Sequence, residues 1–262
     1  MEKLNLENIK AEKTQTIEFI GAPGVGKSTL YKKLRGIKPP LQKWTYIDAV
    51  LKPAPPFFKF LDWSNYQLRK LLKKKHHQSV NSIKGIKYIQ KHKELAQFIW
   101  EHLSDSSFPA NQILGQRYRS AFYLFRDFSR YQTISEVSQS TYCIIDEGLL
   151  QRSYLLNNDP VKVNALLEEY LSLVPLPQAV FYVYIDSTPL ILQRLKGRHK
   201  TLIGHIGLNN DDLFEDIQRW QMLMKLIVEN IKRQGVKVFP INGENPVAEN
   251  LKRILEILNK EL

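Results

Sequence analysis

The sequence predicts an α/β fold in which about five parallel strands form a central sheet between two layers of helices, with a helical insertion between the second and third strands. Two observations support this fold class. Short apolar, β-branched or aromatic runs alternate with longer segments of helical spacing, the order typical of a parallel sheet covered on both faces. The interval between the second and third runs is about ninety residues, too long for a single crossover connection.

Five runs predict the strands, because each is apolar and each is followed by turn or polar residues. These strands are expected at residues 16–20, 44–47, 142–145, 179–185 and 236–241. Apolar residues at three- and four-residue intervals predict helices beside the later strands, at residues 161–173, 212–233 and 246–258. Since no internal repeat is visible, we expect one domain that spans residues 1–262.

The predicted insertion covers residues 53–140. Pro53, Pro55 and Pro56 open it as a bend. Three segments inside it have helical spacing, at residues 66–75, 83–103 and 111–137. The basic run at 73–77 falls at the end of the first of these helices, where lysine side chains interact favourably with the helix dipole, so we interpret it as a solvated helix end.

The balance of basic and acidic residues indicates which kind of binding partner the protein favours. Lys and Arg number 38 against 26 Asp and Glu, which gives a formal charge of +12. That excess favours anions, whether nucleotide phosphates, nucleic acid or an acidic membrane surface. One Cys excludes an internal disulfide, and no stretch approaches the roughly 18 uncharged apolar residues of a membrane span. The N-terminal segment lacks the apolar core of a signal peptide, so we expect a cytoplasmic protein.

Residues 21–28 read GAPGVGKS, which matches the phosphate-loop pattern GxxxxGK(S/T) between the predicted strand TIEFI and the helix-like STLYKKL. Glycines let successive backbone N–H groups point at a β-phosphate, and the following helix adds N-terminal positive charge. Lys27 can reach the β- and γ-phosphates, and the Ser28 hydroxyl can ligate Mg²⁺. We therefore predict an ATP and Mg²⁺ site. Its loop residues are Gly21, Ala22, Pro23, Gly24, Val25, Gly26, Lys27, Ser28 and Thr29.

A phosphate loop requires a carboxylate that holds Mg²⁺, directly or through water, at the end of a neighbouring strand. Asp146 ends the run at 142–145, so we assign it to the metal. Glu147 follows it, and an Asp-Glu pair at this point is also what an ATP hydrolase uses, with the Glu polarising the attacking water. Transferase and hydrolase therefore both stay open at this motif. Cys143 lies inside the strand, which indicates a core residue.

A basic segment follows the fourth strand and contains Arg194 and Arg198, four residues apart on one helix face or its frayed end. Two guanidinium groups there can neutralise the charge that develops on a transferring phosphoryl group. Gly197 and Gly204 would let residues 194–207 move as a lid. The alternative is a solvated basic face.

Inside the insertion, Arg119, Arg126 and Arg130 share a helix face by steps of seven and four residues. Their helix leads into the strand that ends at Asp146, so its C-terminal half can face the acceptor. We assign the three arginines to acceptor binding. No recognisable nucleic-acid-binding motif accompanies them.

Together, these residues resemble the nucleoside and nucleotide kinase group of phosphate-loop proteins, in particular thymidylate kinases and deoxynucleoside kinases. The resemblance covers most of the chain in order, and the phosphate loop is its specific match. It implies an acceptor held by the inserted helices, an acceptor-binding arginine at Arg126 or Arg130, and a lid with paired arginines at 194–207. It also implies that Asn242 and Gly243 line the adenine pocket.

The chain departs from this group at two places. Asp146, Glu147 and Gly148 stand where thymidylate kinases carry Asp-Arg and deoxynucleoside kinases Glu-Arg-Ser, and the nearest arginine is Arg152. After the second strand, the arginine with which thymidylate kinases hold the acceptor phosphate is absent. Asp48 there resembles the carboxylate base of deoxynucleoside kinases.

We therefore predict an ATP- and Mg²⁺-dependent phosphotransferase, a small-molecule kinase whose acceptor is a nucleoside, a nucleotide or a similar compound. Lys27, Arg194 and Arg198 would stabilise charge, and Asp48 or Glu147 would accept the proton of a hydroxyl acceptor. A phosphate acceptor would need arginines instead of a base. The alternative is a regulatory or mechanical ATPase whose basic insertion contacts nucleic acid, membrane or protein. Nucleotide binding without catalysis and a homodimer also stay open.

Overall fold

The central sheet has five strands, all parallel, in the order β2-β3-β1-β4-β5. This arrangement comes from a computed structural model, which describes residues 13–37, 43–51, 58–71, 81–104, 116–137, 141–156, 163–198, 205 and 207–262. The strands are β1 (Lys13–Ile20), β2 (Trp44–Tyr46), β3 (Tyr142–Ile145), β4 (Leu176–Tyr184) and β5 (Lys237–Asn242). The predicted α/β class and the five-stranded parallel sheet are confirmed.

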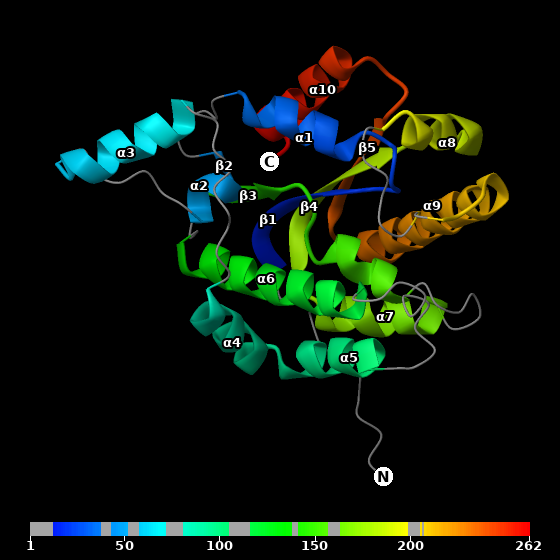
Figure 1. Cartoon of the computed structure of the whole chain (residues 1–262), viewed down its shortest axis with the longest axis horizontal. Coiled ribbons are helices and arrows are strands. Elements are labelled where there is room, and N and C mark those ends of the chain that lie inside the picture. Colours follow the sequence, from blue (N-terminus) through cyan, green and yellow to red (C-terminus); the bar gives the residue numbers. More distant parts are fainter. Residues whose placement is uncertain are drawn as a thin grey trace, which may run out of the picture.

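Helices cover both faces of the sheet (Figure 1). The first face carries α1 (Lys27–Arg35) and α10 (Val247–Lys260), which pack against each other. The opposite face carries α6 (Gln116–Val137), α7 (Val163–Leu173) and α9 (Asn210–Arg233). Helix α8 (Thr188–Lys196) packs on α9. The helices at 163–173, 210–233 and 247–260 lie where periodicity predicted them, to within two residues.

Capping explains why α9 begins before its predicted start. The side chain of Asn209 accepts hydrogen bonds from the backbone N–H groups of Asp211 (2.8 Å) and Asp212 (2.9 Å), and the Asp212 carboxylate accepts one from the Asn209 N–H. These bonds satisfy donors that the first turn of a helix leaves unpaired. The cap therefore adds two polar residues to the apolar periodic segment.

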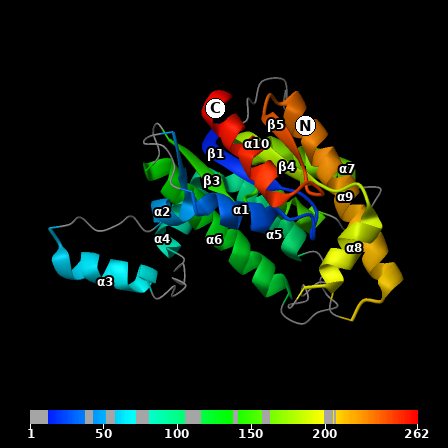
Figure 2. The same ribbon diagram turned by 90° about the horizontal axis from the view of Figure 1, so that it is seen from above.

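Between β2 and β3, the described residues form five helices. They are α2 (Ile47–Leu51), α3 (Phe60–Leu71), α4 (Ser82–Lys91), α5 (Lys93–Ser104) and α6. Helix α4 packs beneath α6 and α5 beneath α7, so they add a further layer on that face (Figure 2). Helix α3 stands apart from the other elements in both views. The proposed bend at residues 53–56 and the basic run at 73–77 lie outside the described residues.

The prediction of one helix at 83–103 is wrong, because His92 interrupts it. The backbone of His92 has φ −120° and ψ 60°, outside the helical region, and its ring packs on that of Tyr88 with centroids 4.3 Å apart. Both shorter helices still bury an apolar side, with Tyr88 in α4 and Leu95 and Phe98 in α5. Periodicity continues across the break, so the pattern alone does not reveal it.

Strand β1 lies at the centre and pairs with β3 and β4. Glu18 is in register with Ile145 on one side and with Val180 on the other. Because the strands are parallel, the segments that follow β1 and β3 leave the sheet at the same edge. The segments after residues 20 and 145 are therefore neighbours. Cys143 in β3 is fully buried, as expected of a core residue, and burial raises the pKa of its thiol to about 12.

Within the described part of the chain, no helix combines the length and the apolarity that crossing a bilayer requires.

Candidate functional site

The segment 21–26 joins β1 to α1 through backbone conformations that favour glycine. Gly24 has φ 92° and Gly26, at the N-cap of α1, has φ 105°. Both values lie in the left-handed region, where a Cβ atom is unfavourable. A Cβ on Gly24 would also lie 2.8 Å from Cγ2 of Ile191 in α8. The loop is thus fitted closely to α8, and it delivers Lys27 to the first position of α1.

The Lys27 side chain turns back over this loop. Its Nζ donates hydrogen bonds to the carbonyl oxygens of Gly21 (2.6 Å) and Ala22 (3.0 Å), and the residue is only 6% exposed. A buried ammonium must be paired or hydrogen-bonded to be tolerated. The loop carbonyls supply those bonds here.

Three charged residues from two distant segments of the chain act on the pKa of this ammonium group. Burial lowers the pKa of Lys27 to about 8, while the nearby carboxylates of Glu147 and Asp146 raise it and the Arg198 guanidinium lowers it. The interaction between two charges weakens as their separation grows, so these side chains lie near Lys27. The structure therefore gathers Lys27, Asp146, Glu147 and Arg198 at one edge of the sheet.

Asp146 has the properties of a metal-binding carboxylate. Burial and the neighbouring Glu147 raise its pKa, while Lys27 and a hydrogen bond with Ser28 lower it. Its Oδ1 is buried, and no hydrogen-bond partner for that atom is found among the described residues. An unpaired buried oxygen costs free energy unless a ligand satisfies it. Carboxylate and hydroxyl oxygens are the ligands that Mg²⁺ prefers, so Asp146 and Ser28 fit that ion.

Among the described residues, no group of three or more His, Cys, Asp and Glu side chains is arranged to hold a metal ion. A Mg²⁺ ion at Ser28 and Asp146 would therefore complete its shell with water and phosphate oxygens, as Mg²⁺ commonly does. Ser28 and its neighbour Thr29 are both exposed, so ligands can reach them.

The two arginines of the predicted lid point to different partners. Helix α8 ends at Lys196, so Arg198 lies beyond it, while Arg194 lies in its last turn. The frayed-end alternative of the prediction therefore applies. Arg194 Nη1 donates to the carbonyl oxygen of Gly243 (3.0 Å), whereas Arg198 is exposed and close enough to Lys27 to lower its pKa. Most of the residues between Arg198 and Gly207 lie outside the described residues.

The turn after β5 approaches the loop at 21–26 closely. A Cβ on Gly243 would overlap with the carbonyl oxygen of Val25, so only glycine fits there. The preceding Asn242 is tied into the turn, because its Oδ1 accepts from the Glu244 N–H (2.9 Å) and its carbonyl accepts from Asn250 Nδ2 (2.8 Å). Asn242 and Gly243 therefore lie beside the loop.

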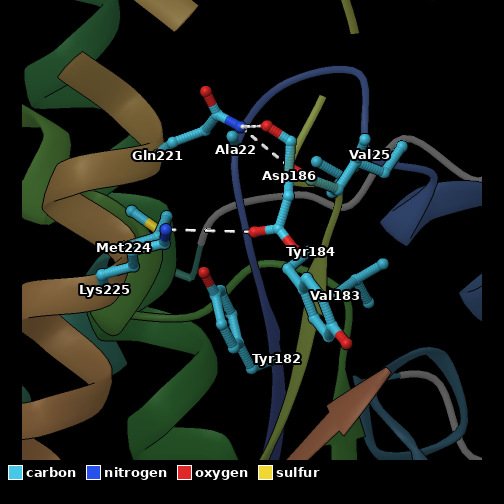
Figure 3. A pocket seen from close by; sticks show the side chains of 10 residues that line it. Ala22, Val25, Tyr182, Val183, Tyr184, Asp186, Gln221, Met224 and Lys225 are labelled. Atoms are coloured by element: carbon cyan, nitrogen blue, oxygen red, sulfur yellow. Dashed lines mark hydrogen bonds and ion pairs between the residues drawn. The ribbon is translucent and has the colours of Figure 1, made fainter. Parts of the chain in front are cut away.

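A small pocket lies between this loop, the end of β4 and α9 (Figure 3). Gln221 spans it, donating from Nε2 to the carbonyl oxygen of Ile185 (2.8 Å), and Lys225 pairs with Asp186 at 3.9 Å. The Gln221 hydrogen bond fastens α9 to the strand end beside the loop, so the pocket belongs to the framework of the site.

Asp48 lies away from Lys27. It forms an ion pair with Arg35, and both side chains are roughly half exposed, at 42% and 51%. Arg35 is in the last turn of α1, about 12 Å along the helix axis from Lys27. The role of Asp48 as a base stays a prediction, and it would require this ion pair to open.

A cluster of arginines surrounds a fully buried carboxylate in α6. Asp127 accepts hydrogen bonds from Arg130 Nη1 (2.8 Å) and Arg152 Nε (2.7 Å), and Arg126 Nη2 lies 3.5 Å away. Burial would raise the pKa of Asp127, but the three guanidinium groups outweigh it and hold that pKa below its usual value. We call Arg126, Arg130, Arg152 and Asp127 the arginine cluster. Its formal charge is positive, because three cations face one anion.

The arginine cluster has unused donors and an aromatic wall. The ring of Tyr123 lies under Arg126 (4.8 Å from the centroid) and Arg152 (5.5 Å). The Nε atoms of Arg126 and Arg130 are buried, and neither has an acceptor within the described ranges. Arg130 also acts on the pKa of Asp146, so the cluster adjoins the Lys27 edge. Arg119, which the sequence placed on the same face, is exposed.

Three consecutive residues of a 3₁₀ segment, η3 (Leu150–Leu156), connect these parts. The Leu150 N–H donates to Glu18 Oε2 in β1 (3.3 Å). Gln151 pairs with both backbone groups of Gly21, accepting from its N–H (3.2 Å) and donating to its carbonyl (3.3 Å). Arg152 belongs to the arginine cluster. One short segment therefore fastens the strand, the loop and α6.

Glu18 supports the turn that carries Asp146 and Glu147. Tyr131 donates its hydroxyl proton to Glu18 Oε1 and accepts from the Leu149 N–H (3.1 Å). A Cβ on Gly148 would overlap with both the Glu18 carboxyl and the Tyr131 hydroxyl. Burial raises the pKa of Glu18 to about 7, against the hydrogen bonds from Tyr131 and Leu150, which lower it. The turn is therefore seated directly on this side chain.

Sequence reasoning assigned no role to Glu18, Asp127, Gln151 or Arg152. Two of these residues have sequence features that could have drawn attention to them. Glu18 is a charged residue inside an apolar strand, and Asp127 stands three residues before Arg130, the spacing of a helical ion pair. Gln151 gave no signal, because its partner is a backbone group 130 residues away.

No protein-family model and no curated protein sequence matches this chain at a significant level.

Proposed function

We propose that this protein is a phosphate-loop kinase that transfers a phosphoryl group from Mg²⁺-bound ATP to a small acceptor. One observation carries the proposal: the Lys27 ammonium is buried at the N-terminus of α1, and charges on Asp146, Glu147 and Arg198 from distant segments act on its pKa. A cation, two carboxylates and a helix N-terminus at the end of parallel strands are the groups that phosphoryl transfer uses.

The donor site consists of the loop at 21–28 and its neighbours. Lys27 would exchange its bonds to the loop carbonyls for bonds to phosphate oxygens, since those carbonyls hold it in place without fully compensating its charge. Ser28 and Asp146 would hold Mg²⁺, which when bound neutralises phosphate charge. Arg198 would stabilise the transferring group, and the turn at Asn242 and Gly243 would lie beside the base.

The acceptor site is the arginine cluster. Three guanidinium groups face a single carboxylate, and two of their Nε atoms are buried without an acceptor. A bound anion would satisfy both the charge and the donors, because guanidinium groups bind phosphate and carboxylate oxygens well. We therefore propose an acceptor that carries an anionic group, such as a nucleotide or another phosphorylated compound.

ATP hydrolysis is a second candidate, and the position of Glu147 favours it. This carboxylate lies close enough to Lys27 to raise its pKa. A base at that distance from the phosphate site can polarise a water molecule as well as accept a proton from a hydroxyl group. The two candidates differ in whether turnover requires an acceptor.

ADP formation measured with and without a panel of nucleosides, nucleotides and sugar phosphates tests the proposal. We expect turnover that depends on an anionic acceptor, and Lys27→Ala should lower kcat by about 10²- to 10³-fold. Lys33→Ala is the matched control, because Lys33 is exposed on the same helix. Equal turnover without any acceptor would identify a hydrolase, and nucleotide binding without turnover would exclude both enzymes.

A further inference from the structure

Tyr31 in α1 is a buried tyrosine whose hydroxyl group is unpaired within the described structure. The residue is only 5% exposed, and its hydroxyl oxygen has no hydrogen-bond partner among the described residues. Buried tyrosines ordinarily pair this group, because an unpaired buried polar atom has lost its hydrogen bonds to water without replacing them. Tyr31 follows Lys27 by four residues, which places both on one side of α1. Tyr31 therefore lies one helical turn from the proposed donor site.

The ring contacts of Tyr31 fix where this hydroxyl group lies. The ring packs edge-on against Phe19 of β1, with centroids 6.1 Å apart, and against Tyr46 of β2, with centroids 6.3 Å apart. Strand β3 lies between β1 and β2 in the sheet, so a ring that contacts both lies over β3. Tyr46 is in register with Ile144, so the ring is close to the end of β3, which Asp146 follows.

Charges from both sides of the site act on this hydroxyl group. Burial raises the pKa of Tyr31, the carboxylates of Asp48 and Asp146 raise it further, and the Arg130 guanidinium lowers it. The hydroxyl group therefore keeps its proton at neutral pH and can both donate and accept a hydrogen bond. Arg130 acts on the pKa of Asp146 as well. The hydroxyl group of α1, the carboxylate after β3 and the guanidinium of α6 thus adjoin one another at the same edge of the sheet.

Three more buried side-chain atoms at this edge lack a partner within the described ranges. They are Oδ1 of Asp146 and the Nε atoms of Arg126 and Arg130. Together with the Tyr31 hydroxyl group, they offer hydrogen-bond donors, an acceptor and a group that can act as either. Water molecules would satisfy these hydrogen bonds but not the two net positive charges of the arginine cluster. A ligand that is both charged and polar therefore accounts for more of the site than water does.

We propose that the acceptor is a phosphate ester with a free hydroxyl group, and that Tyr31 binds this hydroxyl group while the arginine cluster binds the phosphate. This inference rests on the proposed acceptor site. Two net positive charges match a dianionic phosphate better than a singly charged carboxylate. A second anionic group does not fit beside Tyr31, because Asp48 and Asp146 would repel it. A neutral hydroxyl group fits, since it can accept from Tyr31 and donate to a carboxylate.

Ligand binding by Tyr31→Phe tests this proposal without using ATP turnover. Calorimetric titrations of the full chain compare inorganic phosphate with glycerol 3-phosphate, ribose 5-phosphate and the ribonucleoside monophosphates, which add hydroxyl groups. They are run with and without Mg²⁺ and a non-hydrolysable ATP analogue, which fills the phosphate loop. We expect at least one ester to bind the unchanged protein more tightly than phosphate does. Tyr31→Phe should weaken binding of that ester about tenfold and leave phosphate binding unchanged, because one hydrogen bond is lost.

Tyr46→Phe is the matched control. The Tyr46 ring packs against Tyr31, but its hydroxyl group is already paired, because it donates to the carbonyl oxygen of Leu34 (2.6 Å). We expect Tyr46→Phe to lower the thermal midpoint of unfolding and to keep the affinity for every ester. Tyr31→Phe should not lower the midpoint of the ligand-free protein, because the hydroxyl group that it removes makes no hydrogen bond there. The two variants thus separate loss of binding from loss of folding.

Several results would overturn the proposal. A midpoint for Tyr31→Phe as low as that of Tyr46→Phe would show that a buried water molecule pairs the hydroxyl group in the free protein. Weaker binding of the ATP analogue, in place of the ester, would assign Tyr31 to the donor site. If phosphate binds but no ester depends on Tyr31, this inference alone is wrong. If neither phosphate nor any ester binds, the proposed acceptor site fails together with it.

Discussion

Two fully buried carboxyl groups lie close to the candidate site, and their pKa values are shifted in opposite directions. Burial raises the pKa of Glu18 in β1 to about 7, whereas Asp127 in α6 keeps a pKa below its usual value. The partners of Glu18 are a tyrosine hydroxyl and a backbone N–H, and those of Asp127 are three guanidinium groups. Burial alone therefore does not decide whether an interior carboxyl group is ionised.

The different partners of Glu18 and Asp127 indicate different roles, one structural and one in ligand binding. Glu18 has neutral donors for both of its oxygens, so it acts as a support for the turn at 146–149. Asp127 is outnumbered by cations, so the region around it attracts anions. Substitutions at these residues and at the turn between them test this difference.

Replacing Asp127 by Asn should have the largest effect on stability. Three guanidinium groups would then face one another without a buried counter-charge, and breaking a buried ion pair in this way costs about 3–5 kcal/mol. Urea unfolding measures the loss. Inorganic phosphate should restore part of it if the cluster binds anions. Asp186→Asn is the control, because Asp186 is 74% exposed and its pair with Lys225 should contribute little. A similarly small loss for Asp127→Asn would remove the contrast with Glu18.

The pH dependence of stability should report Glu18. The folded protein retains the Glu18 proton up to about pH 7, whereas the unfolded chain loses it near pH 4.5. Between these values the folded state binds more protons, so stability falls as pH rises, by roughly 3 kcal/mol in total. Unfolding free energies between pH 4 and 8 should show this decline relative to Glu18→Gln, which cannot ionise. Parallel curves for the two proteins would mean that Glu18 is ionised when folded.

Gly148→Ala should be less costly but clearly destabilising. The new methyl group would overlap with the Glu18 carboxyl and the Tyr131 hydroxyl, and overpacking of this kind costs about 1–3 kcal/mol. Thermal unfolding compared with Gly207→Ala, where a Cβ meets open space but the backbone has φ 83°, separates packing from backbone strain. A larger loss at Gly207 than at Gly148 would show that the turn can move away from Glu18.

Gln151→Ala should have the smallest effect on stability, about 1 kcal/mol, because its two hydrogen bonds to Gly21 are long. Binding of a non-hydrolysable ATP analogue should weaken several-fold, since Gln151 holds the first residue of the loop. Calorimetric titration measures that change. Unaltered affinity would indicate that the loop keeps its shape without this contact.

Much of the fold could be predicted because it depends on local patterns. Each strand is an apolar run, and the loop at 21–28 reads as a motif whose carboxylate partner, Asp146, ends the neighbouring strand. The break at His92 escaped prediction because periodicity is preserved across it. Arg194 and Arg198 could be identified as a pair, but the end of α8 between them, which sends one toward Gly243 and the other toward Lys27, depends on tertiary contacts.

The arginine cluster could be predicted only in part. Helical spacing brings Asp127, Arg126 and Arg130 together, and the sequence contains that information. It does not contain the burial of Asp127, or the arrival of Arg152 from η3. Similarly, Glu18 is visible as a charged residue in a strand, but its ionisation state depends on which groups of α6 and η3 surround it.

The central position of β1 has a consequence for synthesis on the ribosome. This strand is made before both of its neighbours, because β3 and β4 come more than a hundred residues later in the chain. At about 5–20 residues per second, β1 waits roughly 10–30 s for β4 to emerge. During that time Ile17, Phe19 and Ile20, which end fully buried, have no sheet to join. The nascent chain is therefore expected to need shielding by chaperones until its C-terminal half is available.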